Sequence, residues 1–260
     1  MKIAVFDAAW PDAVKQVHHE HQQFADPSIA PNIYSWYAQR LRFLGDRLQQ
    51  FAPQARAILD IGCAQGSLAI HLGEKGLAVT GNDIRDSYIQ YAKLRDDRHC
   101  VNFQVGNFMT AGYREQFDAV FFTEVIEHLI DHDEFLQKIR DALKPGGTLF
   151  VTTPNQEYIR ERLPSFTQID LAANKSREFS ARGEDHFYLF KKDELIQLFE
   201  RNRFSVLHHE YFLPFIQNGS LKLSLLWKIF PRGLMETISK PFNGANRLCA
   251  QQCLIVRKPL

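Results

Sequence analysis

Hydrophobic and polar positions along the chain follow two periods, and the two periods alternate. From Tyr34 to Phe51, apolar residues recur every three or four positions, which predicts an amphipathic helix. After it, short apolar runs typical of buried strands alternate with segments of helical period. The predicted strands span residues 57–62, 77–83, 101–106, 117–123, 147–153, 204–211 and 253–257, and the predicted helices between them span 67–75, 86–96, 131–143 and 191–202.

This alternation predicts a doubly wound α/β domain at 56–260, preceded by an N-terminal helical cap at 1–55. Strand–helix–strand units form right-handed crossovers, so we expect a mostly parallel sheet with helices on both faces. The alternation of strands and helices is interrupted at 156–190 and at 212–248, and we interpret these segments as insertions. Residues 1–30 show little periodicity, and we expect them to be loosely ordered.

Composition and charge narrow the class of protein. The chain is 45% hydrophobic and 23% charged, which excludes a disordered, collagen-like or disulfide-scaffold protein. The net charge of +1 conceals a gradient, because residues 211–260 carry +6 and the first 210 residues carry −5. The net charge of the whole chain argues against a polyanionic partner. The basic and apolar tail nevertheless makes an anionic or lipid-linked partner a remaining alternative.

The cysteine spacing and the apolar runs bear on the compartment. The four cysteines lack the paired spacing of a zinc site, and we expect free thiols in a reducing compartment. No apolar run has the length of a membrane span or a signal peptide. The sequence predicts a cytoplasmic protein.

A glycine-rich turn follows the first predicted strand, with the sequence Asp60-Ile61-Gly62-Cys63-Ala64-Gln65-Gly66. Ligands of doubly wound folds bind at the carboxyl ends of the strands, and glycines let the backbone approach them closely. Asp83 ends the second strand, where an acid can accept hydrogen bonds from ribose hydroxyls. The dinucleotide fingerprint needs a glycine where Ala64 stands. The pattern therefore favours a nucleoside site of another kind.

The motifs resemble those of class I S-adenosylmethionine-dependent methyltransferases. The resemblance rests on Leu59–Cys63, Val79–Ile84, Phe117–Val120 and Leu143–Gly147, in that order, and covers about residues 55–155 plus the closing strands. It implies a Rossmann-like, seven-stranded sheet with a reversed last strand, and S-adenosyl-L-methionine as methyl donor. The donor-binding residues that it implies are Asp60, Gly62, Gly66, Asp83, Ile84, Asn107, Phe108 and Thr123.

Some of these residues have specific roles in the resemblance. Asp83 would hold the ribose hydroxyls, Ile84 would pack on the adenine, and Asn107 would accept from the adenine amino group through its carbonyl oxygen. In the related quinone-pathway enzymes an N-terminal arginine also reaches the donor, and Arg40 or Arg42 would serve here.

Two acids and a histidine follow the fourth predicted strand, where an acceptor or the transferable methyl group would lie. Glu124, Glu127 and His128 would share one face if this stretch forms a helical turn. Two carboxylates and an imidazole can form half of a divalent-metal site. Acids are also favoured at a helix start by its dipole without any metal, so spacing alone leaves both interpretations open.

The same residues, with a later histidine, resemble the Glu-x-x-Glu-His turn and histidine of small-RNA 3′-terminal 2′-O-methyltransferases, which hold magnesium. The ubiquinone-biosynthesis O-methyltransferases have a similar turn. The resemblance implies Glu124, Glu127, His128 and His186 as ligands of a divalent metal such as Mg²⁺. His128 and His186 are the candidate catalytic residues, as bases or as ligands, because a hydroxyl nucleophile needs a proton acceptor or a metal.

The sequence thus predicts an S-adenosylmethionine-dependent methyltransferase that acts on a hydroxyl of a small molecule, lipid intermediate or glycan. One alternative is 2′-O-methylation of an RNA 3′ end, but the segment between Pro154 and His186 lacks the basic bias that phosphate contacts need. The other is a non-catalytic, nucleoside-binding partner protein. For the tail at 211–260, an acceptor lid, peripheral membrane contact and a dimer surface remain open.

Overall fold

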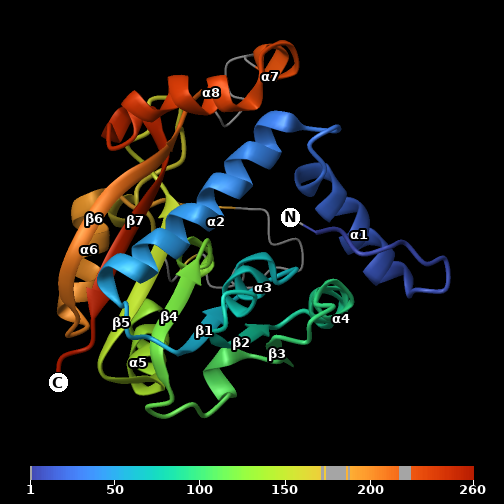
Figure 1. Ribbon diagram of the computed structural model, residues 1–260. Coiled ribbons are helices and arrows are strands. Elements are labelled where there is room, and N and C mark those ends of the chain that lie inside the picture. Colours follow the sequence, from blue (N-terminus) through green and yellow to red (C-terminus); the bar gives the residue numbers. More distant parts are fainter. Residues whose placement is uncertain (1, 171–172, 174–185, 187, 217–223) are drawn as a thin grey trace. The chain divides into compact units, whose positions relative to one another are not determined.

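The computed structural model describes residues 2–170, 173, 186, 188–216 and 224–260 (Figure 1). The chain divides into two compact units, which are described separately below. Unit 1 comprises Met1–Gly112 and Leu213–Pro241, and unit 2 comprises Tyr113–Phe212 and Phe242–Leu260. Parts of both predicted insertions, at 171–172, 174–185, 187 and 217–223, lie outside the described residues.

Unit 1 contains a parallel sheet in the order β3-β2-β1. Strand β1 is fully buried at Ile58 and Leu59, as expected for a strand that is covered on both faces. The elements of this sheet region are β1 (Ala57–Ile61), α3 (Ser67–Gly73), β2 (Ala78–Asp83), α4 (Asp86–Arg95), β3 (Val101–Val105) and the 3₁₀ turn η1 (Phe108–Thr110).

Four further helices belong to unit 1, namely α1 (Asp12–Ala25), α2 (Pro31–Phe51), α7 (Ser224–Ile229) and α8 (Arg232–Ser239). The expectation of a loosely ordered N-terminal segment is wrong for α1. Its inner face buries Val17, His18 and His21, and both imidazoles approach the hydroxyl of Tyr91 on α4, at 3.3 Å and 3.1 Å. Histidine counts as polar in a hydrophobicity pattern, but here it packs as a core residue.

Unit 2 contains four strands in the order β4-β5-β7-β6. β4 and β5 are parallel, and β7 is antiparallel to β5. The elements are β4 (Phe117–Thr123), η2 (Ile126–His128), α5 (His132–Ala142), β5 (Leu143–Pro154), η3 (Phe166–Gln168), α6 (Lys192–Arg201), β6 (Ser205–Pro214), η6 (Asn246–Leu248) and β7 (Cys249–Arg257), with η5 (Lys240–Phe242) between the units.

The strands of the two units follow the order β3-β2-β1-β4-β5-β7-β6 of one seven-stranded sheet. This confirms the predicted Rossmann-like fold, including the reversed last strand. One boundary differs, because β5 begins at Leu143, four residues before the start predicted for this strand at residue 147. Within the part of the chain that the structure describes, no helix has the length and apolar character needed to cross a bilayer.

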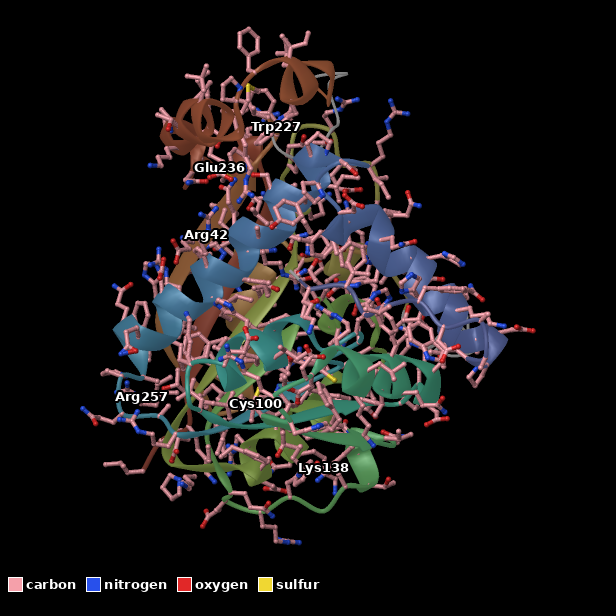
Figure 2. The ribbon with its side chains drawn as sticks, turned by 45° about the vertical axis from the view of Figure 1, so that its right-hand side comes forward. Arg42, Cys100, Lys138, Trp227, Glu236 and Arg257 are labelled. Carbon is pink, nitrogen blue, oxygen red and sulfur yellow. The ribbon has the colours of Figure 1, made fainter. Side chains whose placement is uncertain are left out.

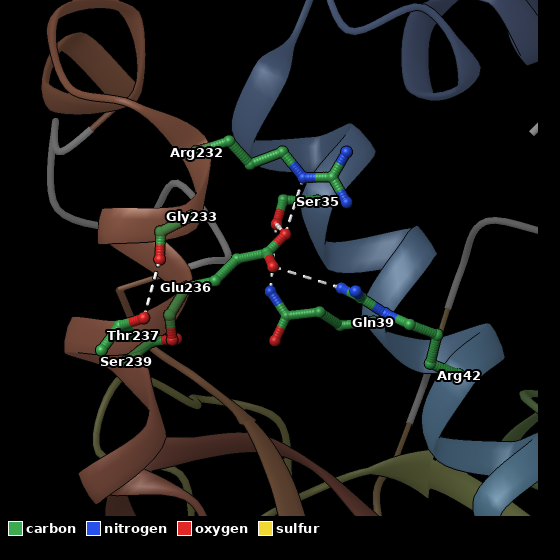
Figure 3. A network of polar contacts seen from close by, with 8 residues as sticks. All are labelled: Ser35, Gln39, Arg42, Arg232, Gly233, Glu236, Thr237 and Ser239. Atoms are coloured by element: carbon green, nitrogen blue, oxygen red, sulfur yellow. Dashed lines mark hydrogen bonds and ion pairs between the residues drawn. The ribbon is translucent and has the colours of Figure 1, made fainter.

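Glu236 fixes α8 to α2 within unit 1. Its carboxylate accepts hydrogen bonds from Ser35 Oγ at 2.8 Å and Arg42 Nη2 at 3.3 Å, both on α2, and from Arg232 Nε at 2.6 Å (Figure 3). Burial opposes ionisation, but the hydrogen bonds from Arg232 and Ser35 hold the pKa of Glu236 below its ordinary value. Figure 2 shows Glu236 on the C-terminal helices, with Trp227 above it and Arg42 on α2 below it. Glu236 is the only acidic residue of 211–260, and it attaches α8 to α2.

We expect Glu236→Gln to lower the free energy of unfolding by about 1–3 kcal/mol, since hydrogen bonds to a charged group contribute on that order. Because the pKa of Glu236 is lowered by folding, this stability is present at neutral pH and is lost as the pH falls through the folded-state pKa. Chemical denaturation at pH 7 and pH 4 measures both effects. Glu134→Gln, at an exposed position of α5, is the matched control and should change little; equal losses in the two variants would contradict the assignment.

Candidate functional site

The glycine-rich turn after β1 is held on the end of β2 in unit 1. The amide of Gly62 donates to the carbonyl oxygen of Asn82 at 2.8 Å. Gly62, Ala64 and Gly66 all have positive φ, of 67°, 47° and 75°, a conformation that glycine adopts at little cost. A Cβ at Gly66 would lie 2.6 Å from the ring of Phe103, so this position requires glycine on both grounds.

Asp83 is oriented by two backbone amides. Its Oδ2 accepts from the amide of Ala64 at 2.9 Å, and its Oδ1 accepts from the amide of Arg85 at 2.9 Å. Each carboxylate oxygen keeps a further lone pair for a ligand hydroxyl. The next residue, Ile84, is 52% exposed although it follows a buried strand. The end of β2 therefore presents a fixed acceptor and an apolar side chain next to each other, as a ribose and an adenine would need.

Asp60 is a second buried carboxyl group, on β1. Burial raises the pKa of Asp60 to about 7; the charge of Arg40 opposes this rise and that of Asp83 adds to it. Arg40 is thus close enough to act on this carboxyl, whereas Arg42 is bound to Glu236. Of the two arginines considered from the sequence, Arg40 is the one that the structure leaves as a candidate for the donor site.

Asn107 and Phe108 follow β3 and start the turn η1. Asn107 caps this turn, because its Oδ1 accepts from the amide of Met109 at 2.9 Å. That oxygen has a second lone pair, so it can still accept from an adenine amino group. Phe108 is only 6% exposed. Its side chain therefore packs within the unit, and it would meet a ligand through its backbone.

Two threonines of β5 hold the two glutamates that follow β4 in unit 2. Thr152 Oγ1 donates to Glu124 Oε1 at 2.8 Å, and Thr153 Oγ1 donates to Glu127 Oε2 at 3.0 Å. Thr152, Thr153 and Glu127 are fully buried. The register pairs Thr123 with Thr152, so the parallel strands themselves bring these groups together. Sequence analysis missed the threonines; the signal was two adjacent hydroxyls at the end of a buried strand.

Glu124 does not lie on the same helical turn as the other two motif residues. Its φ is +56°, and its amide donates to the carbonyl oxygen of Thr152 at 2.8 Å. The turn η2 begins only at Ile126. The single face expected for all three residues is therefore not formed, and Glu127 and His128 are the pair that shares the turn.

Glu127, His128 and His186 come together in what we call the acid–histidine cluster. One ligand-type atom from each lies within 4.8 Å of the others. The ring centroids of the two histidines are 4.8 Å apart, and His186 Nε2 lies 3.7 Å from Glu127 Oε1. Burial lowers the pKa of His186, although Glu124 and Glu161 oppose the shift. His186 is therefore a neutral imidazole at pH 7, the form that binds a metal or accepts a proton.

Comparison with known proteins agrees with this fold. A family model described as a methyltransferase domain matches residues 36–209, which is more than half of the chain. The ubiquinone biosynthesis O-methyltransferase of Nitrobacter winogradskyi is 30% identical over 216 residues, which cover 77% of this chain and 80% of that protein. The mitochondrial ubiquinone biosynthesis O-methyltransferase of Homo sapiens is 33% identical over 153 residues, covering 52% and 41%. The chain thus spans less than half of the human relative.

Solved structures share the fold at low sequence identity. Phosphoethanolamine N-methyltransferase 2 of Haemonchus contortus, in complex with S-adenosyl-L-methionine, has a TM-score of 0.58 and 17% identity, over 95% of this chain and 57% of that chain. Geranyl diphosphate C-methyltransferase of Streptomyces coelicolor has a TM-score of 0.56 and 16% identity, over 98% and 85%. The chain belongs to the S-adenosylmethionine-dependent methyltransferase family, as the sequence predicted.

Proposed function

We propose that the chain transfers the methyl group of S-adenosylmethionine to a hydroxyl of a small molecule. The observation that carries this proposal is the acid–histidine cluster, which follows β4. The acceptor oxygen attacks the methyl carbon in line, the carbon–sulfur bond breaks, and S-adenosylhomocysteine leaves as a neutral thioether. The protein aligns the two reactants and excludes water. A hydroxyl must also lose its proton, and His128 and His186 are the side chains that we propose accept it.

The donor would bind along the glycine-rich turn of unit 1. We propose that Asp60, Gly62 and Gly66 line its methionine and ribose side, that Asp83 accepts from the ribose hydroxyls, and that Ile84 packs on the adenine. Asn107 and Phe108 stay sequence predictions for the same site, and Thr123, at the end of β4 in unit 2, stays a sequence prediction for donor binding. Two buried carboxyl groups suit a donor that carries a sulfonium charge, because a nearby cation favours the ionised form of an acid.

The raised pKa of Asp60 predicts a pH-dependent affinity for the donor. Near pH 7 this carboxyl is half protonated, and a cationic ligand selects the ionised form. Affinity should therefore fall as the pH drops below about 7, by up to roughly tenfold per pH unit. Calorimetric titration of S-adenosylmethionine between pH 8 and pH 6 measures the effect. In Asp60→Asn we expect weak binding with little dependence on pH; a wild-type affinity that is flat over this range would sink the assignment.

The acid–histidine cluster would also hold a divalent metal, with Glu124 as a further carboxylate nearby. The residues fit such an ion, because a mixed set of carboxylate and imidazole ligands is found for Mn²⁺, Fe²⁺ and Zn²⁺, and carboxylates suit Mg²⁺. A fully buried carboxylate such as that of Glu127 is also stabilised by a neighbouring cation. When bound, the ion would lower the pKa of the acceptor hydroxyl as a Lewis acid.

We expect a chelator to abolish methyl transfer and added Mg²⁺ or Mn²⁺ to restore it. Glu127→Gln should lower kcat by about 10²–10⁴-fold, the range for losing a group that assists proton transfer, while S-adenosylmethionine affinity stays unchanged. Glu134→Gln is the matched surface control. Activity that resists both the chelator and Glu127→Gln would reject the metal.

For the acceptor, we propose an apolar or lipid-linked molecule that bears a hydroxyl. Four apolar side chains of the basic tail are 45–62% exposed, namely Ile229, Phe230, Leu234 and Ile238. Leu234 and Ile238 are four residues apart and lie on one face of α8, while Ile229 ends α7 and Phe230 lies between the two helices. Such a surface supports contact with an apolar acceptor, or peripheral contact with an anionic membrane. The names of the ubiquinone biosynthesis relatives point in the same direction. Glycan and RNA acceptors are the alternatives that the experiment must test.

The acceptor is identified by transfer of a labelled methyl group to fractions of a cell extract, with mass identification of the product. We expect the label as an O-methyl group in the lipid or small-molecule fraction, and at least about a tenfold loss with Asp83→Ala, since one tenfold step corresponds to 1.4 kcal/mol of lost binding. Label confined to short RNA would support the RNA alternative instead. A wild-type chain that binds no S-adenosylmethionine in calorimetry would leave only a non-catalytic role.

A further inference from the structure

A buried tyrosine–histidine pair contacts the turn η2 from within unit 2. Tyr188 is fully buried, and its Oη lies 2.8 Å from the carbonyl oxygen of Leu129 and 3.1 Å from that of Ile126. His132 Nε2 lies 2.6 Å from the same Oη and 3.2 Å from the carbonyl oxygen of Ile126. In the sequence, these two carbonyl groups flank Glu127 and His128, the cluster residues of η2.

The pair is hydrogen-bonded to the turn in either tautomer of His132. Burial lowers the pKa of His132 to about 4, so its imidazole is neutral at pH 7 and carries one N–H. With that proton on Nε2, His132 donates to the carbonyl of Ile126; with the proton on Nδ1, Nε2 accepts from the Tyr188 hydroxyl. The Ile126 carbonyl also accepts from the amide of Leu129 at 3.3 Å, so the contacts of the pair add to the hydrogen bond of the turn itself.

The same tyrosine is also close to His186 in the sequence. Tyr188 follows two residues later, so at most about 7 Å of chain separates the two Cα atoms. The next residues are held in turn, because Leu189 forms a β-bridge with Ser165 and Gln252 Nε2 donates to the Phe190 carbonyl at 2.7 Å. One hydroxyl thus connects the chain segment of His186 to the turn that carries the other two cluster residues.

The ring of Tyr188 packs independently of its hydroxyl. Its centroid lies 5.5 Å from that of Phe166, 5.4 Å from that of Phe190 and 6.0 Å from that of His132. A phenylalanine at position 188 would keep these ring contacts and lose the hydrogen bonds. The substitution therefore separates the role of the hydroxyl from the role of the core.

We propose that Tyr188 and His132 are positioning residues, which hold η2 and the His186 segment in the arrangement that forms the acid–histidine cluster. Neither residue touches the reactants in this account; both act through the cluster. The inference rests on the proposed function, because it assumes that the cluster binds a metal or the acceptor hydroxyl. The geometry of the cluster is then fixed by the Tyr188 hydroxyl, which lies outside the Glu-x-x-Glu-His motif.

The test compares Tyr188→Phe with Tyr211→Phe in the full chain. Tyr211 is also buried in unit 2, and its hydroxyl donates to Glu157 at 2.8 Å, away from η2. Mn²⁺ affinity is measured by electron paramagnetic resonance, amide hydrogen exchange is measured over residues 126–129, and S-adenosylmethionine affinity is measured by calorimetry. We expect Tyr188→Phe to weaken Mn²⁺ binding by about 10–100-fold, as loss of a partner behind a metal ligand does, and to speed exchange in the turn. Donor affinity should not change, and Tyr211→Phe should leave all three values as in the wild type.

A second pair of variants tests His132. Glutamine can place an N–H donor near the position of Nε2, so His132→Gln should retain most of the Mn²⁺ affinity that His132→Leu loses. Equal Mn²⁺ affinity and equal exchange in wild type and Tyr188→Phe would overturn the proposal, as would equal losses in both tyrosine variants. If the wild type itself does not bind Mn²⁺, the metal part of the proposed function fails, and hydrogen exchange decides alone: faster exchange in Tyr188→Phe but not in Tyr211→Phe supports positioning, and unchanged exchange rejects it.

Discussion

Burial of the Glu127 carboxylate is the constraint that organises unit 2. A fully buried acid is costly unless hydrogen bonds and opposite charge stabilise it. Thr153 supplies a hydrogen bond from the end of β5, and His186 approaches the other carboxylate oxygen. Both contacts depend on backbone geometry far from Glu127 in sequence, namely the parallel register of β4 and β5 and the end of the first insertion. The chemistry of the cluster therefore depends on the sheet being formed correctly.

Unit 1 must also accommodate buried carboxyl groups. It holds two buried carboxyl groups, Asp60 and Asp83, and burial raises the pKa of Asp60, with a smaller contribution from the charge of Asp83. Backbone amides orient Asp83, while Gly66 in the glycine-rich turn lets the backbone lie against the ring of Phe103. Two carboxyl groups in one site suit a cationic donor. The first 210 residues carry a net negative charge, which the net charge of +1 for the whole chain conceals. Part of this negative charge lies in the proposed donor site.

Much of the fold was predictable because it depends on local patterns. Strand runs, helical periods and the glycine-rich turn are encoded in neighbouring residues, and the order of strands follows from crossover rules. The N-terminal helix α1 was missed because two of the residues on its buried face are histidines, which lie against Tyr91. The positive φ of Glu124 was also missed, because a strand-to-turn transition at a non-glycine residue has no sequence signal.

The partners of the site residues were the least predictable part. The pairing of Thr152 with Glu124 needs the strand register, and the contact of Tyr188 with η2 spans 59–62 residues of sequence. The motif residues could be found by their order, but the groups that hold them are specified only by tertiary structure. For this reason the sequence suggested which side chains act, and the structure was needed to suggest why they stay in place.

We propose that the acid–histidine cluster receives the acceptor hydroxyl. A crystal structure of the chain with S-adenosylhomocysteine and its identified acceptor would show where the reacting oxygen lies. We expect this oxygen within hydrogen-bond distance of His186 or His128, or bound to a metal that the cluster holds. An acceptor whose reacting oxygen lies elsewhere, with the cluster in contact with neither it nor a metal, would rule out this role of the cluster.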